Sequence, residues 1–306
     1  MPVRNGAPFL PKSIYDIEAN TLDCDEILVV NDGSMDDTEK ILNEWSQKNN
    51  KVRVLTTQGT GLVNALNLGV SEASNNWIAR FDVDDGYSFS RITEQRKVIS
   101  NSISAIFCDY QFNDPKGNRL GVIPSAVNEH ATALSLISSQ RTPHPGVLLN
   151  RKDVLSVGGY RKEDFPAEDI SLWLRLSNLG KITSVPHVLL YYRLSKQSIS
   201  AQNRASAKTR TDQLIKEIGI SKDHVDYCLK EWREVFNDYS KMSFSAERKL
   251  LFYRDLKKSI QIITYNDPSK KQLKEIEGYL LRDAGSYKAL SYLLAGKIQR
   301  KIYRTI

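Results

Sequence analysis

The sequence predicts an α/β protein with a mostly parallel, mixed sheet flanked by helices and followed by a C-terminal helical extension. Short apolar runs rich in Val, Ile and Leu alternate with segments that carry apolar residues at helical spacing. Polar and acidic residues follow directly after two of these runs. Strand patterns fade after about residue 200. We therefore expect an α/β domain over residues 1–200 and a helical, basic region over residues 201–306.

The alternating elements can be followed in order along the chain. Ser34 and Asp37 resemble a capping box that opens a helix with Trp45 on its apolar face. A later helix begins after Pro166 and ends before Gly180, which is a typical C-terminal cap. Its expected apolar face is formed by Leu172, Trp173, Leu176 and Leu179. Strands are expected at residues 26–30, 52–55, 77–81 and 103–108, with a helix at residues 61–74.

The composition is that of a globular protein. Of the 306 residues, 41% are hydrophobic and 26% are charged. Cys24, Cys108 and Cys228 lie far apart without a Cys-x-x-Cys spacing, which argues against a disulfide framework or a zinc site. The sequence contains no apolar run of membrane-spanning length and no signal-peptide pattern. These features lead us to expect a cytoplasmic protein.

The net charge of +7 is concentrated in the C-terminal region. Residues 201–306 hold 22 Lys or Arg against 13 Asp or Glu. Within residues 287–302, apolar residues recur near one helical face with basic residues around them. This segment could lie on anionic lipid at the inner face of the cell membrane, or it could pack within the molecule. We expect no nucleic-acid partner.

Two acidic sites follow apolar runs at the expected rim of the sheet. Asp32 ends one run, and Asp82, Asp84 and Asp85 follow another. In an open α/β sheet, ligands bind beyond the carboxyl ends of the strands, so both sites should lie at one rim. Three carboxylates so close together repel one another unless a hard cation such as Mn²⁺ or Mg²⁺ lies among them. The alternative is a solvated acidic turn.

Four segments in order resemble one protein family. Together they are similar to the inverting glycosyltransferases of family 2, which have the GT-A fold, a Rossmann-like arrangement. The matching segments are residues 1–6 (Met-Pro-Val-Arg-Asn-Gly), 30–34 (Val-Asn-Asp-Gly-Ser), 61–67 (Gly-Leu-Val-Asn-Ala-Leu-Asn) and 78–85 (Ile-Ala-Arg-Phe-Asp-Val-Asp-Asp). The likeness covers most of residues 1–200 and includes the family's Asp-x-Asp motif.

This resemblance implies a nucleotide-sugar donor, with UDP-sugar expected, and a saccharide or lipid-linked acceptor. It assigns metal binding to Asp84, assisted by Asp82, with Mn²⁺ or Mg²⁺ as the cofactor. The residues that it places near the donor are Pro2, Arg4, Asp32, Gly61, Arg80 and Asp82. For Asp32 the alternative is capping of the following helix, and for Arg80 it is a structural ion pair.

A second element resembles the family's Glu-Asp motif at residues 166–169. The likeness makes Asp169 the general base that removes the acceptor proton, with Glu168 beside it on the acceptor side. The alternative is that both carboxylates only complement the dipole of the following helix, whose N-terminus would lower their pKa values. His144, within Thr-Pro-His-Pro, is a further acceptor-side candidate, or else a packed loop residue.

The sequence departs from the family pattern at three places. Ser195 stands where many relatives have a late metal-binding His, and Lys196 follows it. Arg4 occupies a position where an aromatic residue is usual. The family's apolar strand before Met-Pro-Val has no counterpart ahead of Met1, so we expect the first strand to be missing.

Two other functions remain open from the sequence. Residues 82–86 superficially resemble the Asp-x-Asp-Gly motif of haloacid-dehalogenase phosphatases, although that motif should open the fold. The departures and the basic C-terminal region would also fit a catalytically impaired transferase that binds a membrane or a scaffold. No motif names the sugar, the acceptor or the linkage.

Overall fold

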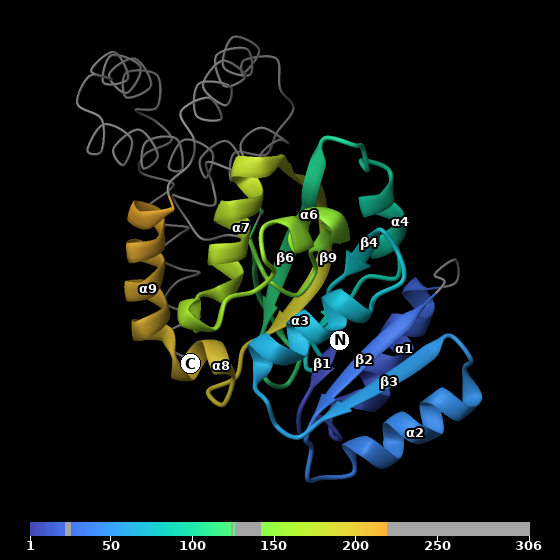
Figure 1. Ribbon diagram of the computed structural model, residues 1–306. Coiled ribbons are helices and arrows are strands. Elements are labelled where there is room, and N and C mark those ends of the chain that lie inside the picture. Colours follow the sequence, from blue (N-terminus) through green and yellow to red (C-terminus); the bar gives the residue numbers. More distant parts are fainter. Residues whose placement is uncertain (22–25, 124, 126–141, 219–306) are drawn as a thin grey trace, which may run out of the picture.

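The computed structural model describes residues 1–21, 26–123, 125 and 142–218. Figure 1 shows a blue N-terminal sheet beside a green and yellow sheet, with helices packed on their faces. One sheet has three strands in the order β1-β2-β3, and the other has the order β4-β8-β6-β9-β5 with β7 paired to β6. The expected α/β class is confirmed.

The first sheet is parallel throughout, because each of its strands is followed by a helical crossover. Val29 and Val30 of β2 are buried between helices, as a two-sided parallel strand requires. The elements are β1 (Pro2–Val3), α1 (Leu10–Asn20), β2 (Ile27–Asp32), α2 (Thr38–Lys48), β3 (Val52–Thr57) and α3 (Leu62–Glu72).

The second sheet is mixed. Its β6 and β9 run parallel, whereas β4–β8, β6–β8, β6–β7 and β5–β9 are antiparallel. Its strands are β4 (Trp77–Ala79), β5 (Gly86–Tyr87), β6 (Ile103–Asn113), β7 (Arg119–Ile123), β8 (Leu148–Asn150) and β9 (Lys181–Arg193). Its helices are α4 (Arg91–Arg96), α6 (Arg151–Ser156), the 3₁₀ helix η1 (Lys162–Asp164), α7 (Glu168–Leu179), α8 (Ile199–Gln202) and α9 (Arg204–Glu217).

The expected capping box before α2 is wrong. The helix begins at Thr38, whose N–H donates to Asp36 Oδ1 over 3.0 Å. The Ser34 hydroxyl instead accepts the N–H of Asn5 at 2.9 Å. This contact joins the segment after β1 to the turn after β2. Ser34 therefore stabilises these two loops and does not cap α2.

Helix α7 is buried on nearly all sides, whereas the sequence predicted a single apolar face. Leu172 and Trp173 are fully buried, and the Trp173 ring packs edge-on against Phe107 of β6 at 5.2 Å between centroids. Leu179, expected on the buried face, is 52% exposed. Helix α9 also packs against α7 and buries Leu214. The helix is therefore central to the core.

This difference in burial gives a matched test of the core. Leu172→Ala should lower the free energy of unfolding by about 2–5 kcal/mol, because it leaves a cavity in a packed interior. Leu179→Ala, near the exposed end of the same helix, should change it by no more than about 0.5 kcal/mol. Urea denaturation followed by circular dichroism would compare the two variants, and equal losses would contradict the packing of α7.

The described chain begins with the very short strand β1, which lies within the Met-Pro-Val segment and not ahead of it. Pro2 and Val3 lie opposite Val30 and Asn31 of β2. The backbone carbonyl of Met1 accepts the N–H of Val30 at 2.9 Å. Thus β1 borders only the C-terminal end of β2, and the described part of the chain has no ladder that joins the two sheets.

The region after residue 200 starts with helices, as expected. Arg210 of α9 forms an ion pair with the buried Asp164 at 2.5 Å, which fastens α9 to η1. The segment 287–302 and the remainder of the basic region lie outside the described residues. Within the described ranges, no helix is long and apolar enough to cross a membrane.

Candidate active site

Asp32 is the acceptor at the centre of a loop that follows β3. Its Oδ1 accepts the Thr57 hydroxyl at 2.5 Å and the Thr60 N–H at 2.7 Å, and its Oδ2 accepts the Gly61 N–H at 2.9 Å. Burial alone would raise the pKa of Asp32, but these hydrogen bonds outweigh it and hold the pKa below its usual value. The carboxylate is therefore a fixed anion at the end of β2.

Capping of the following helix is the alternative role that the sequence offers for Asp32, and the structure shows a different contact. Asp32 does not cap α2, the helix that follows it, but orders the turn into α3. Gly61 is the N-cap of α3 with φ at +92°, a conformation that favours glycine. Gly33 meets the same loop so closely that a Cβ would lie 2.6 Å from the Gly59 nitrogen. These glycines allow two strand-end loops to pack together.

The segment after β1 joins this loop. Arg4 is exposed, and its guanidinium would lie about 3.5 Å from a Cβ placed on Gly59. Asn5 has φ at +51°, and its Oδ1 accepts the N–H of Met35 at 2.8 Å. Pro2 is half-buried in β1. The structure thus brings the family-like segments 1–6, 30–34 and 61–67 to one rim of the first sheet.

The acidic run begins three residues after β4. Asp82 Oδ1 accepts Arg80 Nη2 at 2.6 Å, and the Asp82 N–H donates to the Tyr87 hydroxyl at 2.6 Å. Burial and then the charge of Asp82 raise the pKa of Asp84 to about 6. Asp85 is 6% exposed and accepts the Arg193 N–H at 2.8 Å. Burial and the neighbouring Asp84 raise the pKa of Asp85 well above its usual value.

The cations near this run do not neutralise its three carboxylates. Arg80 balances Asp82, but burial and mutual repulsion still disfavour the anions of Asp84 and Asp85. In the described ranges, no group of three or more His, Cys, Asp or Glu side chains forms a complete cage for a metal. The residues nonetheless fit a hard divalent cation that takes one or two carboxylates and obtains its other oxygens from a diphosphate and water.

Arg80 links the two halves of the site. The guanidinium is buried, at 5% exposure for the residue, and it donates to the Phe81 carbonyl as well as to Asp82. Its charge acts on the pKa values of Asp169 and His144, which come from other parts of the chain. Arg80 therefore forms the structural ion pair that was the alternative role for it. It contacts the candidate site through Asp82.

Asp169 and Glu168 occupy the first turn of α7. Asp169 Oδ1 accepts the N–H of Ile170 at 2.7 Å. Burial nevertheless raises the pKa of Asp169 to about 6, so the expected lowering by the helix N-terminus is outweighed. Burial, followed by repulsion from Asp169, raises the pKa of Glu168 to about 7. Two carboxyl groups thus titrate near neutral pH, where a general base is most effective.

His144 is packed beside Tyr160, whose pKa is raised mainly by burial and also by the charges of Asp169 and Glu168. Its Nε2 lies 2.9 Å from the Tyr160 hydroxyl, and its ring contacts Trp173 edge-on at 5.8 Å between centroids. Burial and then Arg80 lower the pKa of His144 well below its usual value, so the imidazole is neutral. The packed-loop alternative therefore describes the surroundings of His144, with Arg80 as the charge that acts on it.

Arg193 is a further candidate for this site that the sequence did not suggest. It ends β9, and its guanidinium lies 4.8 Å over the ring of Phe9. Its charge lowers the pKa of Asp84, which places the cation near the acidic run. The signal was present, because a charged residue at the end of an apolar strand points to the ligand rim of a sheet. Ser195, in contrast, makes local turn bonds with Gln197 and Ser198.

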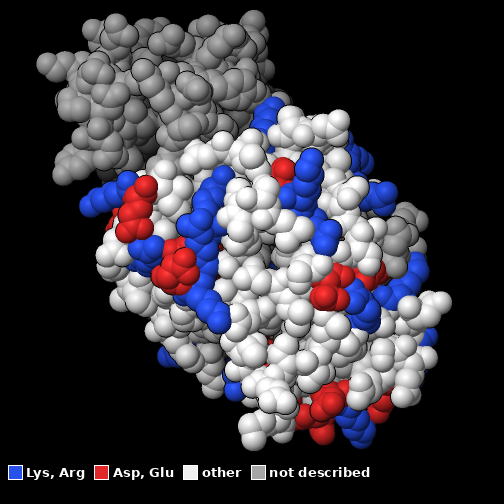
Figure 2. Space-filling model, viewed as in Figure 1, with Lys and Arg blue, Asp and Glu red and all other residues white. Residues whose placement is uncertain are grey.

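Figure 2 shows the charges on one face of the molecule. Lys and Arg side chains lie among clusters of Asp and Glu on the described part of this face.

The fold and the site define a glycosyltransferase of the GT-A class. The family model described as glycosyl transferase family 2 matches residues 1–156, and the chain belongs to this family. Membership confirms the resemblance of the sequence motifs and makes the protein a transferase enzyme. It also removes the haloacid-dehalogenase phosphatase as an interpretation.

Two named relatives are similar over about two thirds of this chain. The amylovoran biosynthesis glycosyltransferase AmsE of Erwinia amylovora is 26% identical over 198 residues, covering 62% of this chain and 73% of that protein. The UDP-Gal:alpha-D-GlcNAc-diphosphoundecaprenol beta-1,3-galactosyltransferase of Escherichia coli is 25% identical over 217 residues, covering 67% of this chain and 75% of that protein.

Solved structures support the fold. The 1–349 fragment of TarS from S. aureus, in complex with UDP-GlcNAc, aligns with a TM-score of 0.59 at 15% identity and covers 98% of this chain and 88% of that one. The mannosyltransferase PcManGT from Pyrobaculum calidifontis, in complex with GDP-Man and Mn²⁺, aligns with a TM-score of 0.59 at 15% identity, covering 99% and 85%. At this identity the likeness concerns the fold alone.

Proposed function

We propose that this protein is an inverting, metal-dependent glycosyltransferase that moves a sugar from a nucleotide sugar, probed first as a UDP-sugar, to a hydroxyl of a saccharide or lipid-linked acceptor. The observation that carries this proposal is the convergence of Asp169 and Asp82 on the charge of the buried Arg80. A base and a donor-side carboxylate then share one site. The relatives named for amylovoran biosynthesis and for a diphosphoundecaprenol acceptor support the kind of acceptor.

The donor side is the rim built on β1, β2 and β3. Asp32, fixed by Thr57 and Gly61, offers its remaining lone pairs to donors on the nucleotide base. The exposed Arg4 over Gly59 supplies a flat cation that suits a base or a phosphate. Pro2 and Gly61 contribute backbone to this rim, and we assign Asp82 to the side of the ribose.

Asp84 is the principal candidate ligand for Mn²⁺ or Mg²⁺, with Asp82 assisting. A bound divalent ion would neutralise the charge that develops on the departing diphosphate. Arg80 holds Asp82 in place at 2.6 Å and so acts as a positioning residue. Asp85 is committed to the backbone of Arg193, which leaves Asp84 as the carboxylate of this run with fewer protein partners.

The transfer itself needs a base and a fixed geometry. Asp169 accepts the proton of the acceptor hydroxyl while the acceptor oxygen forms a bond to the anomeric carbon. The bond from that carbon to the diphosphate breaks, and its electron pair leaves with the nucleoside diphosphate. Attack from the face opposite the leaving group inverts the anomeric configuration. We assign Glu168, which is next to the base in the sequence, and His144, which contacts Tyr160, to the acceptor side.

Arg193, whose charge acts on Asp84, should supply positive charge to the donor diphosphate. Arg193→Gln is expected to raise KM for the donor by about 10- to 100-fold, because a charge-assisted contact to phosphate is lost. Lys196→Gln, which removes an exposed cation from the next loop, should change KM less. Steady-state kinetics with varied donor concentration would compare the two variants. Equal changes in KM would mean that the donor responds to the total positive charge of this region and not to a direct contact with Arg193.

The first experiment is a calorimetric screen of UDP-, GDP- and dTDP-sugars with Mn²⁺ and with Mg²⁺. We expect one donor class to bind only when the metal is present. Analysis of the products with a saccharide or lipid-linked acceptor would then give the anomeric configuration. Binding without turnover over all acceptors would favour the catalytically impaired alternative, and absence of nucleotide-sugar binding would refute the proposal.

We also propose, from the sequence of residues 287–302, peripheral contact with anionic membrane at the cytoplasmic face. The recurrence of apolar residues among Lys and Arg carries this idea. Liposome co-sedimentation of the full chain and of a chain lacking residues 285–306 would test it, since equal binding removes any role for this segment.

A further inference from the structure

The candidate base Asp169 is oriented by the backbone around it. Its Oδ1 accepts the Ile170 N–H at 2.7 Å, a bond within the first turn of α7. A carboxylate held in this way points where the turn places it, because the donor and the acceptor belong to adjacent residues. The direction of Asp169 therefore depends on what fixes the backbone at the start of α7.

Asp164 of η1 closes this turn with its side chain. Its Oδ2 accepts the Ser171 hydroxyl, so one side-chain contact spans the segment 165–170 that holds Asp169. The Asp164 carbonyl also accepts the N–H of Ala167 at 2.7 Å, and the Ala167 carbonyl accepts the N–H of Ser171 at 3.0 Å. Asp164 is thus connected to the chain on both sides of the base.

The other carboxylate oxygen of Asp164 is bound to a distant helix. Arg210 of α9 donates from Nη2 to Asp164 Oδ1 at 2.5 Å. Asp164 is 2% exposed, and a buried carboxylate is strongly disfavoured unless a cation and hydrogen bonds compensate for the loss of water. The Arg210 cation and the Ser171 hydroxyl supply both. The carboxylate that closes the turn is therefore stabilised by α9.

Arg210 is itself held in a defined direction. Its Nη1 donates to Glu217 Oε1 at 3.1 Å, further along α9. The hydrogen bond to Asp164, with that to Glu217, raises the pKa of Arg210, so the guanidinium remains a cation. The Glu217 side chain is exposed whereas that of Asp164 is buried. Loss of Arg210 would therefore matter most at Asp164, whose charge is shielded from water.

We propose that Asp164 and Arg210 are positioning residues for the candidate base: the ion pair with α9 fixes the Asp164 carboxylate, and that carboxylate fixes the turn that directs Asp169. The inference rests on the proposed function, in which Asp169 takes the acceptor proton. A base must lie within hydrogen-bonding reach of the proton that it removes, and a displacement of about 1 Å can cost about 10²-fold in rate. Neither positioning side chain needs to contact a substrate.

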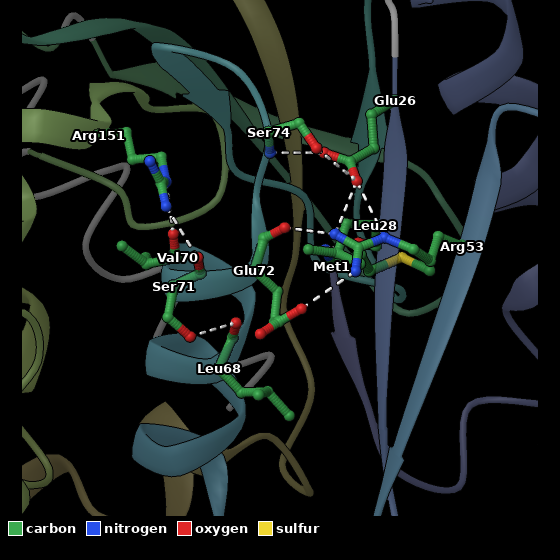
Figure 3. A network of polar contacts seen from close by, with 10 residues as sticks. All are labelled: Met1, Glu26, Leu28, Arg53, Leu68, Val70, Ser71, Glu72, Ser74 and Arg151. Atoms are coloured by element: carbon green, nitrogen blue, oxygen red, sulfur yellow. Dashed lines mark hydrogen bonds and ion pairs between the residues drawn. The ribbon is translucent and has the colours of Figure 1, made fainter.

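An ion-paired arginine elsewhere in the chain provides a comparison. Figure 3 shows Arg53 of β3 between Glu26 and Glu72, with Nε 3.0 Å from Glu26 Oε1 and Nη1 3.1 Å from Glu72 Oε2. Arg53 is the second residue of β3, whereas Asp32 accepts the hydroxyl of Thr57, the last residue of that strand. Arg53 is therefore a control for the loss of an ion-paired arginine away from the candidate site.

The first measurement is amide hydrogen exchange on the full chain without ligands. In Arg210→Met and Asp164→Asn, the Ile170 amide should exchange more than about tenfold faster relative to the Leu174 amide, which lies in the buried middle of α7. A loss of global stability does not raise this ratio, because it speeds exchange at Leu174 as well. Asparagine offers an acceptor oxygen at one of the two positions that Asp164 uses, so it cannot serve Ser171 and Arg210 together.

Two control variants leave this contact intact. Glu217→Gln removes the charge of the other partner of Arg210, and Arg53→Met removes the distant ion pair. Neither variant should raise the ratio of exchange at Ile170 to exchange at Leu174. Arg53→Met should lower Tm, so it reports what a loss of stability alone does.

Steady-state kinetics give the readout that a purely structural role would not change. With the nucleotide sugar that binds in the calorimetric screen, kcat should fall about 10- to 100-fold in Arg210→Met and Asp164→Asn, while KM for the donor stays within about twofold. The donor side is built on β1, β2 and β3, whereas these contacts join η1, α7 and α9. Because both residues act through one contact, the double variant should be no slower than the slower single variant. Arg210→Lys, which keeps the cation, should retain most of kcat.

Three results would overturn the inference. One is an unchanged exchange ratio in Arg210→Met and Asp164→Asn. Another is a faster Ile170 amide with kcat unchanged, because the turn would then have no consequence for the base. The third is an equal loss of kcat in Arg53→Met, which would make the effect one of stability.

Failure of the proposed function gives a different result. Undiminished turnover in Asp169→Asn would refute the proposed base and, with it, the role of Asp164 in the reaction. The exchange ratio needs no turnover, so it would still show whether Asp164 and Arg210 order the start of α7.

Discussion

Asp169→Asn should reduce kcat by about 10²- to 10⁴-fold while leaving the affinity for the donor unchanged. The asparagine has the same shape, and its Oδ1 can still accept the N–H of Ile170, so the start of α7 is preserved. What it lacks is the ability to take the proton of the acceptor hydroxyl. The change therefore removes one chemical role without removing a structural contact.

The pH dependence gives a second readout of the same residue. A base must be deprotonated to act, so with a pKa of about 6 the rate should fall about tenfold per pH unit below pH 6 and level off above it. Calorimetry with the donor and kinetics at varied pH would be run on both proteins. Glu168→Gln is the control, since it alters the neighbouring carboxyl and should leave more activity. Undiminished turnover in Asp169→Asn would reject its assignment as the base.

The sequence predicted β2 and β3 of the first sheet because their signals are local. The run at β2 and the turn after Asp32 lie next to each other in the chain, and parallel crossovers need only the alternation of strand and helix. The pairing of β5 with β9 joins Gly86 to Tyr191, which no local pattern encodes. The all-round burial of α7 was missed for the same reason, since β6 and α9 cover it from distant parts of the chain.

The candidate site also has properties that the local sequence predicts and properties that only the fold determines. The motifs located Asp32, Asp84 and Asp169, but their protonation depends on burial that only the folded chain determines. At Asp169 the local expectation from the helix N-terminus has the wrong sign, because desolvation by the tertiary fold outweighs it. Arg80 was expected at the diphosphate, whereas its burial and its bond to Asp82 make it a positioning residue in the proposed mechanism.

Asp84→Asn should abolish the metal dependence of donor binding. In the proposed mechanism this change removes a ligand of the metal, so metal affinity should fall by more than the roughly 10- to 100-fold that loss of an outer-shell partner costs. In the metal-free protein, substitution removes a carboxylate whose anion is disfavoured by burial and by Asp82, so the fold should gain or hold stability at neutral pH. Weaker binding with an unchanged or higher Tm would separate a ligand from a structural residue.

Asp85→Asn is the matched control for this variant. Asp85 is more deeply buried, and its pKa is raised well above the usual value, so the side chain favours the neutral form that asparagine imitates. Its amide oxygen can still accept the N–H of Arg193. Calorimetric titration of donor with and without Mn²⁺ should therefore show metal-dependent binding in Asp85→Asn and none in Asp84→Asn. The reverse order would move the metal ligand to Asp85 and would require Arg193 to release it when the donor binds.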